Sequence, residues 1–316
     1  MQHKPENIEL SVIIPTYNEE GNIILLIERL EQTMQQIGCS HYEYIFIDDG
    51  STDQSLSYIQ QVRVQNSHVE YLQFSKNFGH QHALKAGLDH ARGAAVVSLD
   101  ADLQHPPELI AEMYQLWKQG AEVVYTRRQD EKSTGFFKRK SAKIFYWLAN
   151  KLAEVPIEEG TADFRLMDRK VVAAIKSYKE SDLFLRGLIP TLGFKQVGLN
   201  YIPAKRHSGK TKYSFSKMFQ FAINGITSSS AKPLYLSIYL GLFFALLAFI
   251  YGCYAIYIAL FTTQAITGWT SLIASVLFIG GIQMILIGIV GIYLGKLFVQ
   301  SKQRPTYIIK ANSIHE

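Results

Sequence analysis

The stretch Ala94-Ala95-Val96-Val97-Ser98-Leu99-Asp100-Ala101-Asp102 is a short apolar run that ends in two aspartates two residues apart. In an extended chain, side chains at positions i and i+2 point to the same face. Asp100 and Asp102 are therefore able to converge on one hard cation such as Mg²⁺ or Mn²⁺. Such ions are typically held by one or two carboxylates with substrate phosphates completing the shell, so a nucleotide diphosphate is the expected second ligand. Taken alone, these residues also suit a solvated Asp-x-Asp turn.

Apolar runs alternate with amphipathic segments on both sides of this stretch. Strands are expected at 10–15, 42–47, 69–74, 94–99 and 122–126, and helices at 23–37, from residue 54, and at 80–91. Such alternation predicts an α/β domain with a mostly parallel, Rossmann-like sheet and right-handed crossovers. A late strand is expected over 194–202, a helix beginning within 182–188, and a short returning strand over 307–309.

Polar side chains follow four of these strands directly. They are Tyr17 and Glu19, Asp48 and Asp49, Lys76, and Asp100 with Asp102. Ligands of parallel sheets bind beyond the carboxyl ends of the strands, so these groups should share one edge. Each has a plainer explanation: Asp49-Gly50 is a common turn, Asp53 a helix N-cap and Lys76 a surface charge. Four such groups in succession favour a binding site.

The charges divide the chain into an acidic front and a basic rear. Residues 183–316 contain 12 Lys and Arg but only one acid, Glu316, and residues 233–295 contain no Asp, Glu, Lys, Arg or His. A basic rear suits nucleic acid or an anionic membrane surface. A spanning helix needs about 20 apolar residues, so the uncharged run predicts two membrane spans, near 234–261 and 271–294, rather than a nucleic-acid partner. A buried hairpin of a soluble protein is the alternative.

Lysines and arginines flank both predicted spans and are missing from the loop between them, which predicts that the soluble domain and both termini are cytoplasmic. Aromatic and basic residues at helical spacing predict an interfacial helix at about 136–152, for which an ordinary surface helix is the alternative. The expected parts are a soluble domain (1–213), a juxtamembrane amphipathic helix (214–232), two membrane helices (233–295) and a C-terminal tail (296–316).

Five motifs in sequence order carry a resemblance to a known family. They are residues 12–19 (VIIPTYNE), 48–53 (DDGSTD), 100–108 (DADLQHPPE), 163–168 (DFRLMD) and 206–213 (RHSGKTKY). They resemble the inverting family 2 glycosyltransferases. Within these, the chain is similar from about residue 10 to residue 310 to the polyprenyl-phosphate hexosyltransferases, which include dolichol-phosphate mannose synthases and bactoprenol glucosyltransferases. The resemblance implies a GT-A-type fold.

The resemblance also implies an activity. A hexose, most simply glucose, would pass from a nucleotide diphosphate sugar to polyprenyl (undecaprenyl) phosphate with inversion, giving a lipid-linked sugar for cell-envelope glycosylation at the inner membrane. Mg²⁺ or Mn²⁺ would be the cofactor, and UDP is favoured over GDP. A homo-oligomer is a further expectation. The donor would be bound by Pro15, Tyr17, Glu19, Asp48, Lys76, Asp100, Ala101, Gln104, Arg127, Arg206 and Lys212, and the metal by Asp100 and Asp102, with Asp102 as the firmer ligand.

Charge on the leaving diphosphate would be stabilised by the metal together with Arg127, Arg206 and Lys212. The catalytic carboxylates implied are Asp100 and Asp163. Because a phosphate monoester is mostly doubly ionised at neutral pH, Asp163 would act either as a mild general base, as the resemblance implies, or by orienting the acceptor.

Two arginines, Arg139 and Arg186, are candidates for the lipid phosphate, and Arg186 equally suits an ion pair with an acid. Arg165 and Asp168 are expected to be structural. A processive polysaccharide synthase is one rival, although its usual Gln-x-x-Arg-Trp motif is missing from the sequence. A non-catalytic membrane module that binds lipid or partner subunits is the other.

Overall fold

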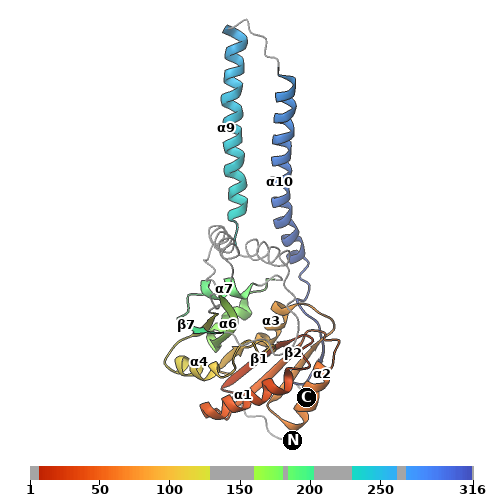
Figure 1. Cartoon of the computed structure of the whole chain (residues 1–316), viewed down its shortest axis with the longest axis vertical. Coiled ribbons are helices and arrows are strands. Elements are labelled where there is room, and N and C mark those ends of the chain that lie inside the picture. The colour runs from red at the N-terminus through yellow and green to blue at the C-terminus, as the bar shows by residue number, and fades with distance from the viewer. Residues whose placement is uncertain (1–6, 129–159, 181–183, 203–229, 262–267, 315–316) are drawn as a thin grey trace.

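The computed structural model describes residues 7–128, 160–180, 184–202, 230–261 and 268–314. Its strands are β1 (Leu10–Thr16), β2 (Tyr42–Asp48), β3 (Val69–Phe74), β4 (Ala95–Ser98), β5 (Val123–Arg128), β6 (Thr161–Asp168), β7 (Gln196–Tyr201) and β8 (Ile309–Asn312). Its helices are α1 (Ile23–Ile37), α2 (Ser55–Gln65), α3 (His80–His90), α4 (Leu109–Lys118), α6 (Arg169–Ser177), α7 (Leu185–Thr191), α9 (Lys232–Phe261) and α10 (Trp269–Ser301). They form a sheet domain from which two long helices rise (Figure 1).

The strands form one eight-stranded sheet in the order β7-β5-β6-β4-β1-β2-β3-β8. Strands β3, β2, β1 and β4 pair in parallel, with Val12 opposite both Tyr44 and Val97. The expected α/β domain with a mostly parallel sheet is confirmed. The predicted strands are found to within about two residues at their ends, because continuous apolar runs are typical of strands buried on both faces.

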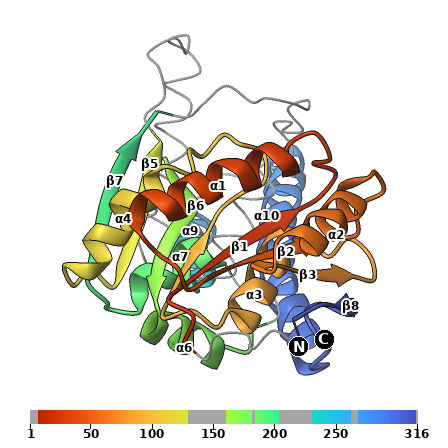
Figure 2. The same cartoon turned by 90° about the horizontal axis from the view of Figure 1, so that it is seen from below.

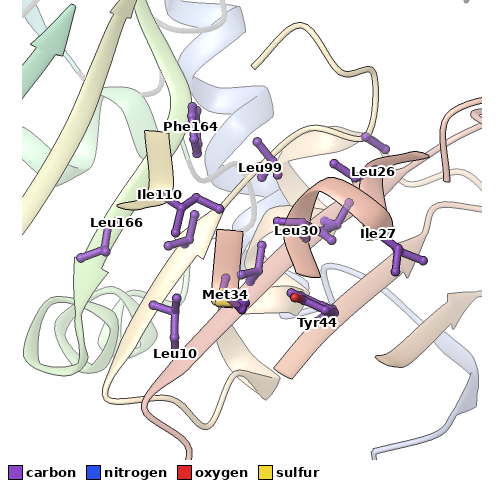
Figure 3. Close-up of a cluster of buried hydrophobic side chains, with 14 of the residues drawn as sticks. Leu10, Leu26, Ile27, Leu30, Met34, Tyr44, Leu99, Ile110, Phe164 and Leu166 are labelled. Atoms are coloured by element: carbon purple, nitrogen blue, oxygen red, sulfur yellow. The ribbon is translucent and has the colours of Figure 1, made fainter. Parts of the chain in front are cut away.

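Helices cover both faces of this sheet (Figure 2). Leu26, Leu30 and Met34 of α1 pack with Leu10 and other strand residues on one face, as Figure 3 shows. Helices α3 and α6 pack on the opposite face against the side chains that alternate with the first set. Full burial of β1 between these two layers explains why its seven residues carry no charge.

Strand β6 is a difference from the sequence-based expectation. It is antiparallel to both β4 and β5 and separates them in the sheet. No strand was predicted here because Asp163 and Arg165 interrupt the apolar pattern. Both residues are nevertheless buried, at 6% and 3% exposure, where other charged groups surround them. Hydrophobic periodicity therefore does not predict this strand, because its charged residues are buried only by being neutralised within the fold.

The chain returns to the sheet after α10 through β8, which pairs antiparallel with β3 and forms one edge of the sheet. A returning strand was expected at 307–309 and is found two residues later. The fully buried Ser313 donates its hydroxyl to Glu70 Oε2 (2.7 Å) and accepts the Tyr71 amide (2.8 Å). The segment that follows the second long helix is thereby fixed to the sheet.

We expect Ser313→Ala to destabilise the domain by about 1–3 kcal/mol, because Glu70 and the Tyr71 amide would each lose a buried hydrogen bond. Thermal unfolding of the purified protein measures this effect. Lys310→Ala, an exposed position of β8, is the matched control and should change stability by less than about 0.5 kcal/mol. Equal melting temperatures for the two variants would contradict the role given to Ser313.

Helices α9 and α10 are long and apolar enough to cross a membrane. The segments whose length and hydropathy suit a membrane span are Lys232–Tyr254 and Phe278–Ser301, each with a mean hydropathy of 2.1. Their side chains are mostly exposed, as expected for helices that face lipid, and this exposure argues against a buried hairpin. The predicted interfacial helix at 136–152 and most of the juxtamembrane helix at 214–232 lie outside the described residues.

Candidate active site

The loops that follow β1 and β2 are tied together at the carboxyl edge of the sheet. Asn18 Oδ1 accepts the Thr52 amide (2.8 Å), and the Glu19 amide donates to Ser55 Oγ (2.9 Å). Asn18 has a φ of 55°, a left-handed conformation that asparagine tolerates better than most residues. This bracing places the polar residues after β1 beside those after β2, as the topology predicts.

Two adjacent buried carboxylates lie at the carboxyl end of β2: Asp48 is its last residue and Asp49 follows it. Asp49 accepts the amides of Phe78 (2.6 Å) and Gly79 (2.9 Å) and so anchors the loop that follows β3. Asp48 accepts the Ser51 amide (3.2 Å) through Oδ1, whereas its buried Oδ2 has no hydrogen-bond partner among the described residues. Burial raises the pKa of both carboxyls, against the hydrogen bonds that lower it.

Gly50 allows the loops after β2 and β3 to touch. Its φ is 71°, and a Cβ there would lie 2.6 Å from the Lys76 carbonyl carbon. We expect Gly50→Ala to displace the Lys76 loop, lowering both the melting temperature and the affinity for a nucleotide sugar. Gly38→Ala is the matched control, since its φ is 66° but nothing lies within 4 Å, so it should show only the strain of about 1–2 kcal/mol. Calorimetric titration of each variant with the nucleotide sugar distinguishes Gly50→Ala from Gly38→Ala. Equal affinities of the two variants would contradict the contact between the loops.

A histidine joins the two aspartates that the sequence nominated for catalysis. His80, the first residue of α3, approaches Asp100 Oδ1 through Nε2 (2.7 Å) and Asp163 Oδ2 through Nδ1 (3.8 Å). Burial disfavours the imidazolium, but Asp100 outweighs it and raises the pKa of His80 to about 9. Burial likewise opposes ionisation of Asp100, yet His80 holds the pKa of that carboxyl below its usual value.

Asp163 is held by a bidentate ion pair. Arg186 donates from Nε to Oδ1 and from Nη2 to Oδ2, both at 2.7 Å, and the Asp163 side chain is 5% exposed. Burial alone would raise the pKa of Asp163, but the guanidinium outweighs it and lowers the pKa. The carboxylate is therefore ionised, and both of its oxygens accept hydrogen bonds. The sequence left two roles open for Arg186, and the structure shows the ion pair with an acid.

The residues around Asp102 fit a divalent cation. Asp102 Oδ1 accepts the Gln104 amide (3.1 Å), and the intervening Leu103 has a φ of 59°, so this turn is strained. The buried Nδ1 of His105 has no hydrogen-bond partner in the described part of the chain and lies 3.6 Å from Asp100 Oδ2. Among the described residues no three acidic, His or Cys side chains form a metal cluster. Two carboxylates are nevertheless sufficient when a diphosphate supplies the remaining oxygens.

The other predicted donor-binding residues occupy varied positions. Pro15 is buried within β1 and Ala101 packs in the core, so neither side chain is exposed. Tyr17 is exposed, and Lys76 is exposed with its ammonium over the Phe78 ring (5.1 Å).

Two further predicted residues are engaged in local hydrogen bonds. Glu19 accepts the Asn22 side-chain amide (2.6 Å), and Arg127 donates to Tyr125 Oη (2.6 Å). Arg139, Arg206 and Lys212 lie outside the described residues. The structure therefore brings together the groups after β1, β2, β3 and β4, and leaves the basic groups of residues 139, 206 and 212 undescribed.

Three side chains near the acidic groups were not nominated from the sequence: His80, His105 and Tyr201. Tyr201 ends β7 with its ring 5.7 Å from that of His105, and burial together with Asp100 and Asp102 raises its pKa to about 12, although Arg128 opposes this. The rule of strand carboxyl ends would have found His80, which follows the loop after β3. No local signal identifies Tyr201, because β7 joins the site only through the sheet order.

Comparison with known proteins gives a consistent result. A family model described as glycosyl transferase family 2 matches residues 11–175. The chain is 41% identical to a prophage bactoprenol glucosyl transferase homolog of Escherichia coli (96% of this chain, 99% of the relative). It is 40% identical to a bactoprenol glucosyl transferase of Shigella phage SfV (96% and 98%).

Among solved structures, Staphylococcus aureus TarS residues 1–349 with UDP-GlcNAc is 18% identical, with a TM-score of 0.47, over 70% of this chain and 66% of that one. The family assignment does not depend on this structural likeness. It follows from the sequence matches, which span nearly the full length of the relatives. With its parallel sheet and the carboxylates at its edge, this chain belongs to glycosyl transferase family 2.

Proposed function

We propose that this glycosyltransferase moves a glucosyl group from a nucleotide diphosphate sugar to a polyprenyl phosphate of the bactoprenol type, using a divalent cation. The observation that carries the proposal is the approach of Asp100 and Asp163 to the same histidine, His80, in a chain about 40% identical to bactoprenol glucosyl transferases over nearly its full length. The two apolar helices support a lipid acceptor, because they suit anchoring at a membrane.

The reaction is a displacement at the anomeric carbon. A phosphate oxygen of the acceptor forms the new bond as the bond to the diphosphate breaks, and the electron pair leaves with the diphosphate. Attack from the opposite side inverts the anomeric centre. Asp100 and Asp102 would hold the cation, which supplies positive charge to the departing diphosphate. Arg127, at the carboxyl end of β5, would add to this charge.

We assign Asp163 to orienting the acceptor rather than to removing a proton. Its two oxygens accept from Arg186, its pKa is lowered, and a phosphate monoester is already mostly doubly ionised at neutral pH. Arg186 is partly exposed and would be shared between Asp163 and the incoming phosphate. Helix α7, which carries Arg186, lies at the end of the sheet domain that faces α9 and α10 (Figure 1). This placement supports delivery of the acceptor from lipid.

The basic residues that flank α9 and α10 support a cytoplasmic active site in a protein of the inner membrane with two spans. Arg139, Arg206 and Lys212 remain candidates for the lipid phosphate and the donor diphosphate. UDP is the proposed nucleotide. The Oδ2 of Asp48, which has no hydrogen-bond partner among the residues that the structure describes, is an acceptor suited to an N–H of the base.

Transfer of label from radioactive UDP-glucose into organic-extractable lipid, with polyprenyl phosphate and Mn²⁺, tests the proposal. Label in the lipid fraction that is lost on chelation of the cation is the expected result. A parallel assay with GDP-mannose should give little label, and the reverse pattern would overturn the choice of nucleotide. Label in a long polymer would favour a processive synthase, and no label with any donor would favour a non-catalytic membrane module.

A further inference from the structure

The side chain of His80 is placed by an anchored loop. The Asp49 carboxylate holds the amides of Phe78 and Gly79, which directly precede His80. Gly79 turns the chain with a φ of 103°, a conformation that favours glycine, and α3 begins at the next residue. The imidazole is therefore presented to the acidic cluster by backbone hydrogen bonds rather than by a flexible loop.

The contact with Asp100 has a defined direction. An ionised carboxylate only accepts hydrogen bonds, so His80 Nε2 carries the proton and donates to Asp100 Oδ1 (2.7 Å). Within the described residues this is the only hydrogen bond to the Asp100 side chain, because His105 lies at 3.6 Å. The orientation of the Asp100 carboxylate thus depends on one imidazole donor.

The same ring also faces the acceptor side of the site. Its Nδ1 lies 3.8 Å from Asp163 Oδ2, and the neighbouring Gln81 Nε2 lies 3.4 Å from the same oxygen. Asp163 is already fixed by Arg186, so its position does not depend on His80. The ring therefore lies between Asp163, which Arg186 fixes independently, and Asp100, which has no other hydrogen-bond donor in the described part of the chain.

We propose that His80 is a positioning residue that orients the Asp100 carboxylate toward the divalent cation of the bound donor and fixes its separation from Asp163. This inference rests on the proposed function. Hydrogen-bond partners of metal-binding carboxylates typically contribute 10–100-fold to metal affinity or activity. His80 is 42% exposed at the start of a helix, so its replacement should disturb the fold little.

The test compares His80→Ala, which removes the donor, with His80→Gln, whose Nε2 amide can reproduce it. Binding of Mn²⁺ to the full-length protein in the presence of UDP is measured by electron paramagnetic resonance, with no turnover involved. We expect His80→Ala to weaken Mn²⁺ binding by about 10–100-fold. His80→Gln should stay within about threefold of wild type, and the measured kcat at saturating Mn²⁺ should recover in part.

His90→Gln is the matched control, since His90 lies at the far end of α3, where its Nδ1 contacts the Ala86 carbonyl of the same helix (2.9 Å). It should bind Mn²⁺ like wild type. Unchanged Mn²⁺ binding in His80→Ala would overturn the inference, as would equal weakening in His80→Ala and His80→Gln. If either result is obtained while the wild-type protein still transfers label to lipid, only the role of His80 is rejected and the proposed function stands. If the wild-type protein does not label lipid, the proposed function itself is rejected.

Discussion

Asp102→Asn is expected to lower the rate of sugar transfer by about a thousandfold while leaving the fold intact. A cation at a departing oxygen contributes several kcal/mol of transition-state stabilisation, and about 1.4 kcal/mol corresponds to a factor of ten in rate. Asp102 is partly exposed in a turn after β4, so loss of one carboxylate charge there should cost little stability. Label from UDP-glucose in extracted lipid measures the rate, and the melting temperature checks the fold.

The control for this prediction is Glu112→Gln, an equivalent loss of charge on the exposed side of α4. It should transfer sugar at the wild-type rate. Weakened binding of Mn²⁺ with UDP should accompany the loss of activity in Asp102→Asn. Turnover within about threefold of wild type would show that Asp102 does not hold the cation, and would leave Asp100 as the carboxylate to test.

Arg186→Leu is expected to destabilise the protein by about 3 kcal/mol and to abolish most transfer. Removing one partner of a buried ion pair leaves the other charge uncompensated, which typically costs 3–5 kcal/mol. The lower value applies because Arg186 is 31% exposed, so water already screens part of the interaction. For a domain of this size the melting temperature should fall by about 6–12 °C.

A double variant separates the structural effect from the chemical one. Asp163→Asn combined with Arg186→Leu removes both charges, so most of the stability should return while transfer stays low. Arg29→Leu is the control, because it breaks the exposed bidentate pair with Glu108 and should cost less than about 1 kcal/mol. Recovery of activity together with stability in the double variant would show that the pair is purely structural.

Much of the site was predictable because its residues follow strands that are recognisable from local patterns. The groups after β1, β2, β3 and β4 share one edge as expected, because the carboxyl ends of parallel strands lie at the same side of a sheet. Arg186 illustrates the limit of such reasoning. Its sequence context left substrate contact and ion pairing equally open, and only the tertiary structure shows its ion pair with Asp163, 23 residues away in the chain.

The sequence by itself determined the alternation of strands and helices, the edge at which polar residues gather and the two apolar helices. This was possible because hydrophobic periodicity and the turn residues that end each element are local properties of the sequence. Only the tertiary structure decided that β6 is an antiparallel strand with buried charges, that Ser313 reaches Glu70 from 243 residues away, and that His80 stands between two aspartates. Each of these features depends on groups that neutralise or hydrogen-bond one another across the fold. The free energy of these contacts cannot be predicted from local sequence patterns, because it arises only when segments distant in the chain come together.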